Sequence, residues 1–189
     1  MATATAVEKP RRRQAHARPT VLIVGNPNVG KSVLFHKLTG RYVTVSNYPG
    51  TTVEVARGLM RYRGQEFVII DSPGIYSLVP ITEEERVARR ILLSDRPDLV
   101  LHVIDAKSLA RTLPLTVQLI ETGVPVVVVL NMMDELERAG LTIQVDALAQ
   151  QLHVPVLPTV CLSGQGVPAV KELIYERLAA LHSDLSPRD

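Results

Sequence analysis

The sequence predicts an α/β domain with a doubly wound, mostly parallel sheet of six strands, one of them antiparallel, and with helices on both faces. Three observations lead to this prediction. The chain has 189 residues, of which 46% are hydrophobic, enough for one domain with a packed core. Short aliphatic runs alternate with segments of helical periodicity. Polar or glycine-rich segments follow these runs, as expected where parallel strands end at a ligand site.

The first half of the chain predicts a strand at residues 21–24, a helix at 31–38 and a long loop at 41–52. The two strands of a hairpin follow at 53–62 and 67–70. The helix ends near Gly40, a residue type that favours helix C-termini. The loop is polar and contains Pro49 and Gly50. The hairpin strands flank a short turn around Gly64, which requires antiparallel pairing.

The second half predicts helices at residues 82–93, 109–121, 134–139, 146–152 and 167–181, and strands at residues 99–104, 126–130 and 154–157. Thr82 is followed three residues later by Glu85, the spacing of a capping box at a helix start. The strands at 99–104 and 126–130 are largely aliphatic, which is typical of strands buried on both faces of a parallel sheet.

Charge separates a basic leader, residues 1–19, from the expected domain at 20–183 and a short tail at 184–189. The leader carries a net charge of +4 and the rest of the chain −2, so the domain has no excess of basic residues for binding nucleic acid. We expect the leader to be disordered; its alternative role is contact with RNA or anionic lipid. A single cysteine, Cys161, excludes an internal disulfide and fits a reducing compartment.

A phosphate-binding loop is predicted at residues 25–32, Gly-Asn-Pro-Asn-Val-Gly-Lys-Ser, between a strand and a helix. Main-chain N–H groups and the helix N-terminus converge on phosphate oxygens in such a loop. We expect Lys31 to bridge the β- and γ-phosphates and the Ser32 hydroxyl to bind Mg²⁺. The expected nucleotide-binding residues here are Gly25, Asn26, Asn28, Val29, Gly30, Lys31, Ser32 and Val33.

Two further segments have the features of γ-phosphate sensors. Asp71-Ser-Pro-Gly74 follows the second hairpin strand, so the carboxylate can hold Mg²⁺ through water and the Gly74 N–H can donate to a γ-phosphate. In the loop before the first hairpin strand, which includes Gly50, a threonine can close over Mg²⁺. Composition does not choose between Thr51 and Thr52. A loop that orders with nucleotide and is released on hydrolysis acts as a switch.

A base-reading segment is predicted at Asn131-Met-Met-Asp134, which differs from the guanine signature Asn-Lys-x-Asp at Met132. One carboxylate accepts both the N1–H and the exocyclic amine of guanine, whereas adenine has neither donor on that edge, so Asp134 predicts discrimination against adenine. Asn131 is expected to tie this segment to the phosphate loop and to approach N7. Met132 keeps an unbranched, polarizable stem for packing on the base.

The loop after the last strand is expected to complete the base site. Val160 and Cys161 lie there, and Cys161 is small enough for its main-chain N–H to reach guanine O6. The alternatives for this thiol are a buried side chain without ligand contact and a redox role.

Together these stretches resemble a small GTPase and, more narrowly, the N-terminal G domain of the bacterial ferrous iron transporter B (FeoB) family. The resemblance covers about residues 20–180 and includes Asn-Tyr-Pro-Gly-Thr-Thr-Val-Glu and Asp-Ser-Pro-Gly-Ile-Tyr-Ser-Leu. It implies a Ras-like P-loop fold and Mg²⁺-dependent hydrolysis of GTP to GDP. It also implies Thr52 as the Mg²⁺-binding switch threonine, and a K⁺ site formed by Asn28 with the carbonyls of Ser46 and Tyr48. By the same resemblance, K⁺ at this site is expected to stand in for an arginine finger.

The resemblance further implies slow, K⁺-stimulated turnover, because Ile75 occupies the place of the water-orienting glutamine of Ras-like enzymes. The implied Mg²⁺ ligands are Ser32, Thr52 and Asp71, and the implied catalytic residues are Asn28, Lys31, Thr52 and Gly74.

The implied setting is the cytoplasmic face of the bacterial inner membrane. The expected partners are GTP or GDP and a membrane permease domain or subunit, without nucleic acid; a homo-oligomer is compatible with this. An excised domain and a stand-alone G protein both stay open. One alternative is an Era/Der-like GTPase in ribosome or RNA-associated assembly, with the leader as its RNA contact. Another is a nucleotide-binding module with negligible turnover.

Overall fold

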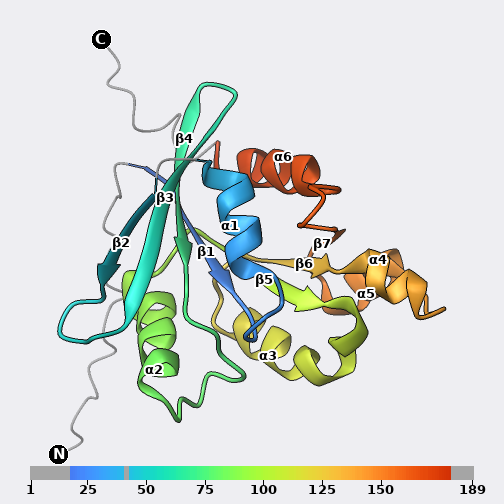
Figure 1. The fold of residues 1–189 in the computed structure, drawn as a ribbon, viewed down its shortest axis with the longest axis horizontal. Helices are drawn as coiled ribbons and strands as arrows, with labels where there is room; N and C mark the ends of the chain where they lie inside the picture. Colours follow the sequence, from blue (N-terminus) through green and yellow to red (C-terminus); the bar gives the residue numbers. More distant parts are fainter. Residues whose placement is uncertain (1–17, 41–42, 180–189) are drawn as a thin grey trace, which may run out of the picture.

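One mixed sheet of seven strands, in the order β2-β3-β4-β1-β5-β6-β7, organises the computed structural model, which describes residues 18–40 and 43–179 (Figure 1). The strands are β1 (Thr20–Val24), β2 (Val43–Asn47), β3 (Glu54–Tyr62), β4 (Gln65–Asp71), β5 (Leu99–Asp105), β6 (Val126–Asn131) and β7 (Val156–Pro158). Strand β3 is antiparallel to both of its neighbours, and the other neighbouring pairs are parallel. The predicted mostly parallel sheet with one antiparallel strand is confirmed.

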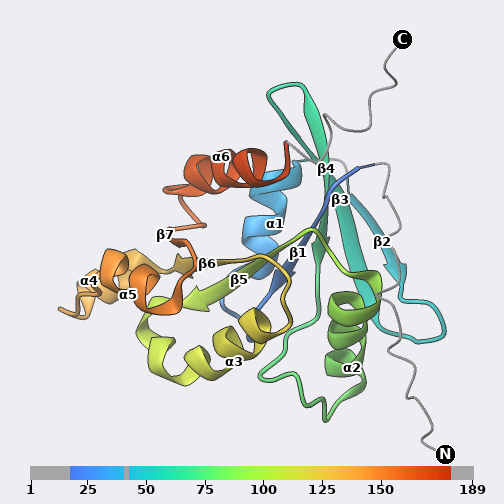
Figure 2. The same cartoon turned by 180° about the vertical axis from the view of Figure 1, so that it is seen from behind.

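Helices cover both faces of this sheet (Figures 1 and 2). They are α1 (Lys31–Thr39), α2 (Glu83–Arg90), α3 (Leu109–Glu121), α4 (Met133–Arg138), α5 (Val145–Leu152) and α6 (Val167–Leu178), with a π turn η1 (Ile91–Asp95) and a 3₁₀ turn η2 (Ala106–Ser108). Leu34 of α1 and Ile174 of α6 share one core cluster, whereas Val87 of α2 and Leu119 of α3 share another. Among the described residues, no helix is long and apolar enough to cross a membrane.

The sequence predicts a loop at 41–52, but residues 43–47 form the edge strand β2, so the sheet has seven strands and not six. Strand β2 pairs with β3 from Val43 opposite Gly58 to Asn47 opposite Glu54. Its residues are exposed except for the half-buried Val43, so the alternation of buried and exposed side chains that signals a strand is absent. The neighbouring strand, and not a local pattern, imposes the extended conformation.

The other differences lie at the ends of elements. The last strand, expected at 154–157, lies at 156–158. The helix expected to end near Leu93 is an α-helix to Arg90 and continues as the π turn η1. The final helix ends at Leu178 with Ala179 as its C-cap. Residues 180–181 of its expected span, residues 1–17 of the leader and the tail lie outside the described residues.

The sheet brings the expected site residues to one edge. Strands β1, β4, β5, β6 and β7 run parallel, so their carboxyl ends lie side by side. The phosphate loop follows β1, Asp71 ends β4, and Asn131 ends β6. The opposite end of the hairpin is anchored: the guanidinium of Arg63 lies 5.5 and 5.4 Å from the ring centroids of Tyr62 and Tyr175.

Candidate nucleotide-binding site

The phosphate loop turns the chain from β1 into α1 through unusual backbone angles. Gly25, Asn28 and Gly30 have φ values of 152°, 64° and 95°. A Cβ atom on Gly30 would lie 2.3 Å from Nδ2 of Asn131, and one on Gly25 would lie 2.3 Å from the carbonyl oxygen of Val103. Both positions therefore require glycine for space as well as for backbone conformation.

Lys31 and Ser32 begin α1 and meet the end of β4. The Lys31 ammonium donates to the carbonyl of Asn26 at 2.8 Å, and burial lowers the pKa of this group. The Ser32 hydroxyl donates to Oδ2 of Asp71 at 2.7 Å. The other carboxylate oxygen of Asp71 is buried and has no hydrogen-bond partner among the described residues. A hydroxyl beside a carboxylate with an unpaired oxygen is a donor set that suits Mg²⁺.

The loop between β2 and β3 gives its two threonines different surroundings. The Thr51 hydroxyl donates to the carbonyl of Tyr48 at 2.9 Å and accepts the N–H of Val53 at 3.2 Å. Thr52 is exposed and lines a groove of about 530 Å³ together with Ser32 and Asp71. The structure therefore brings Thr52 toward the candidate Mg²⁺ ligands, while the Thr51 hydroxyl serves the turn.

The three residues implied for K⁺ lie on the phosphate loop and around the end of β2. Asn28 is exposed, and Ser46 pairs with Val55 in the sheet. The carbonyl of Tyr48 accepts both the N–H of Thr51, at 3.0 Å, and its hydroxyl. A cation can take this carbonyl as a ligand only if the turn releases one of these bonds.

The segment after β4 packs directly on the phosphate loop. A Cβ atom on Gly74 would lie 2.8 Å from Cγ of Pro27, and the N–H of Ile75 donates to the carbonyl of Gly25 at 3.1 Å. The Ile75 side chain is 1% exposed, inside the core. A buried aliphatic side chain cannot orient a water molecule at this position.

Glu85 has a role beyond the predicted capping box. The box is confirmed, since the Thr82 hydroxyl accepts the N–H of Glu85 at 3.2 Å and the carboxylate accepts the N–H of Thr82 at 3.3 Å. The same carboxylate also accepts the N–H groups of Ile81, at 2.8 Å, and Tyr76, at 3.4 Å. These main-chain donors, that of Ile81 above all, lower the pKa of Glu85. The Glu85 carboxylate thus also fixes the backbone of the loop after Gly74. The spacing of a capping box does not predict this second role.

Thr82→Ala is expected to destabilise the protein by about 1 kcal/mol, because the first turn of α2 loses the side chain that accepts its main-chain N–H. Chemical denaturation measures this change. Thr142→Ala, the same exchange at an exposed position outside the helices and strands, serves as the control. Equal stability of the two variants would show that the cap contributes nothing.

Asn131 joins three parts of the site. Its Nδ2 donates to the carbonyl of Val29 at 2.9 Å, which confirms the expected tie to the phosphate loop. Its Oδ1 accepts the N–H of Cys161 at 2.8 Å and the hydroxyl of Thr159 at 3.3 Å. The Cys161 N–H expected to reach guanine O6 therefore points to Asn131 in this structure. Thr159 was not anticipated; its only sequence signal is a hydroxyl residue directly after the last strand.

The Cys161 thiol is buried among core residues. It is 1% exposed and its Sγ lies 3.6 Å from Oγ1 of Thr159. Burial raises the pKa of this thiol, which keeps it protonated, and the thiolate is the reactive form. Among the alternatives for Cys161, the surroundings favour a packing role over a redox role. Val160 turns its N–H to the carbonyl of Gln165 at 3.0 Å.

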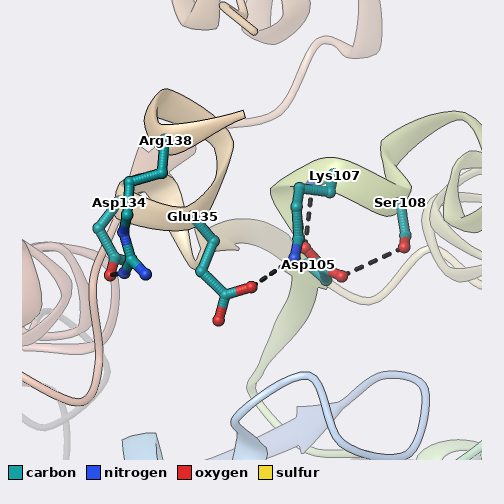
Figure 3. A network of polar contacts seen from close by, with 6 residues as sticks. All are labelled: Asp105, Lys107, Ser108, Asp134, Glu135 and Arg138. Carbon is teal, nitrogen blue, oxygen red and sulfur yellow. Dashed lines mark hydrogen bonds and ion pairs between the residues drawn. The ribbon is translucent and has the colours of Figure 1, made fainter. Parts of the chain in front are cut away.

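The start of α4 carries two carboxylates in ion pairs (Figure 3). Met132 has a φ of 62° and precedes the helix as its N-cap. Asp134 pairs with Arg138, and Glu135 pairs with Lys107. The N–H of Lys107 donates to Oδ1 of Asp105 at 2.9 Å. Helix α4 is thereby connected to the turn η2, which follows β5.

Comparisons with known proteins agree with this arrangement. Residues 19–174 match the family model described as Ferrous iron transport protein B. The chain is 45% identical over 163 residues to the Fe(2+) transport protein A/Fe(2+) transporter FeoB fusion protein of Porphyromonas gingivalis, covering 86% of this chain and 19% of that protein. It spans about a fifth of the length of the curated relatives it matches.

Solved structures give the same family. A mutant of S. thermophilus NFeoB bound to GDP is 47% identical with a TM-score of 0.77, covering 82% of this chain and 60% of that one. The FeoB G-domain from Methanococcus jannaschii is 35% identical with a TM-score of 0.76, covering 86% of this chain and 98% of that one. The chain therefore belongs to the ferrous iron transport protein B (FeoB) family and corresponds to its N-terminal G domain.

Proposed function

We propose that this chain binds GTP and hydrolyses it to GDP and phosphate, and that it regulates ferrous iron transport across the bacterial inner membrane. The observation that carries the proposal is the convergence of three segments at one sheet edge: the phosphate loop, the Ser32–Asp71 pair and the segment held by Asn131. The GDP bound to the S. thermophilus relative supports a guanine nucleotide as the ligand.

In this proposal, contacts to the nucleotide replace contacts that these side chains make within the protein. Lys31 moves its ammonium from the Asn26 carbonyl to the phosphates, and negative charge there offsets the cost of burying the ammonium. Ser32, Asp71 and Thr52 would hold Mg²⁺, which would supply positive charge beside the phosphates. Gly74 lies close to the phosphate loop, so its N–H can donate to the γ-phosphate.

Hydrolysis proceeds without a glutamine that orients the attacking water. The corresponding residue, Ile75, is buried, so main-chain groups of the two switch segments must position the water. We therefore propose slow turnover with K⁺ held by Asn28 and the carbonyls of Ser46 and Tyr48. K⁺ binding would require release of one of the two Thr51 bonds to the Tyr48 carbonyl, which would couple the ion to the loop between β2 and β3.

Phosphate release is expected to be about tenfold or more faster in KCl than in NaCl, because a cation beside the phosphates stabilises the charge of the transition state. Asn28→Ala is expected to retain nucleotide binding and lose this stimulation. Asn47→Ala, an exposed exchange in β2, is the control and should keep it. Equal rates of the wild type in both salts would contradict the K⁺ site, and near-zero rates would indicate a binding module without turnover.

The proposed partner is a membrane permease domain or subunit at the cytoplasmic face of the inner membrane. Uptake of labelled ferrous iron by cells that carry the permease is the test. Uptake should require the wild-type chain and fail with Lys31→Ala, and equal uptake with both would refute the proposed coupling.

The RNA-associated alternative rests on the basic leader as the RNA contact. If this alternative is wrong, deletion of residues 1–19 should leave the retention of the chain on RNA unchanged.

A further inference from the structure

The base-reading carboxylate has a cationic partner within its own helix. Asp134 and Arg138 are one turn apart on α4, and Nη2 of Arg138 pairs with Oδ2 of Asp134 (Figure 3). Their side chains are 41% and 71% exposed. Opening this pair therefore requires no change in the protein core.

The guanidinium of Arg138 and the reading edge of guanine present the same chemical group to a carboxylate. Guanine offers its N1–H and its exocyclic amine from one N–C–N unit, in one plane. A guanidinium also offers paired, coplanar N–H donors that match a carboxylate. Arg138 already binds one of the two oxygens of Asp134 that the base needs. The side chain and the base cannot both use that oxygen in the paired geometry.

The neighbouring charges direct Arg138 to Asp134. The adjacent carboxylate, Glu135, is paired with Lys107 from the turn after β5. Lys107 is itself held there, since its N–H donates to Asp105 at 2.9 Å. Arg138 is thus left with Asp134 as its partner among the described ion pairs.

We infer that Arg138 competes with the guanine base for Asp134 and thereby lowers the affinity of the chain for guanine nucleotides. This inference rests on the proposed base-reading role of Asp134. An exposed ion pair between residues one helical turn apart is weak, so the competition raises the Kd of GDP by about two- to threefold. Salt screens the pair, and the effect shrinks as ionic strength rises.

The test is the Kd of GDP for the wild type and for Arg138→Ala, measured by titration calorimetry at about 50 and about 500 mM salt. Arg138→Ala is expected to bind GDP two- to threefold more tightly at low salt, with the ratio approaching one at high salt. Arg111→Ala removes an exposed cation from α3 and is the control, with no tightening expected. Unchanged or weaker binding by Arg138→Ala would overturn the competition.

The Asp134→Asn background separates this inference from the proposed function. An asparagine forms no ion pair, so Arg138→Ala is expected to leave the Kd of XDP unchanged in that background. If Asp134→Asn does not change the base preference, the base-reading role fails. If the preference changes but Arg138→Ala does not tighten GDP binding in the otherwise wild-type chain, the competition fails and the proposed function stands.

Discussion

Asp134→Asn is expected to change the preference of this chain from GTP toward XTP by about 10³-fold. The carboxylate can accept two donors from guanine, whereas an amide offers one acceptor and one donor. Xanthine carries a carbonyl where guanine has its amine, and that carbonyl matches the amide donor. Guanine in the variant leaves polar groups without hydrogen-bond partners, and this mismatch weakens the binding of GTP.

Competition of GDP and XDP for a fluorescent nucleotide measures this preference. Asp146→Asn on α5, an exposed exchange of the same kind, is the control and should bind GDP as the wild type does. Undiminished affinity of Asp134→Asn for GDP would refute the base-reading role. Arg138→Ala, measured alongside, shows how much of any change comes from losing the ion pair.

Acidification is expected to destabilise the protein through His102. This residue is fully buried on β5, where its Nδ1 lies 3.1 Å from Oγ1 of Thr116 and its Nε2 has no partner among the described residues. Burial, with a smaller contribution from the charge of Lys31, lowers the pKa of His102 to about 3. The folded protein therefore keeps this imidazole neutral at pH values where the unfolded chain protonates it.

The direction of the effect follows from proton binding. Between the unfolded pKa of about 6.5 and the folded pKa of about 3, the unfolded state binds more protons, so stability falls as the pH falls. The slope approaches 1.4 kcal/mol per pH unit, or about 2 kcal/mol between pH 6.5 and 5. The stabilising contribution of neutral His102 is fully present above pH 6.5.

Urea denaturation at pH 7 and pH 5 measures this loss. His102→Leu is expected to lose less stability than the wild type over that interval, because it lacks the group that the unfolded state protonates. His153→Gln, a change at an exposed position, should behave as the wild type does. An equal loss in the wild type and His102→Leu would mean that other groups dominate the acid response.

The elements that the sequence predicts well are those with a local signal. Strands β5 and β6 are buried along most of their length and read as aliphatic runs, and the capping box of α2 lies within four consecutive residues. Strand β2 has no such signal, since its side chains are mostly exposed and its conformation depends on β3.

The same distinction applies to the site. Spacing alone locates Lys31, Ser32, Asp71 and Asn131. The structure confirms the expected tie of Asn131 to the phosphate loop, and it adds a hydrogen bond between Ser32 and Asp71. Thr159 enters only because the fold places it beside Asn131, 28 positions away in the chain. The hydrogen bond from the Cys161 N–H to Oδ1 of Asn131 depends on the same proximity of the two segments. Contacts between distant segments are set by the sheet order, which no single stretch of sequence specifies.

The position of Asn131 has a kinetic consequence. One side chain holds both the phosphate loop and the loop after β7, through Val29 on one side and Cys161 on the other. Wide opening of either loop would break its own hydrogen bond to this shared side chain and would free Asn131 to move away from the other loop. The two ends of a nucleotide should then detach in one concerted event, and dissociation should follow a single exponential without a half-released intermediate.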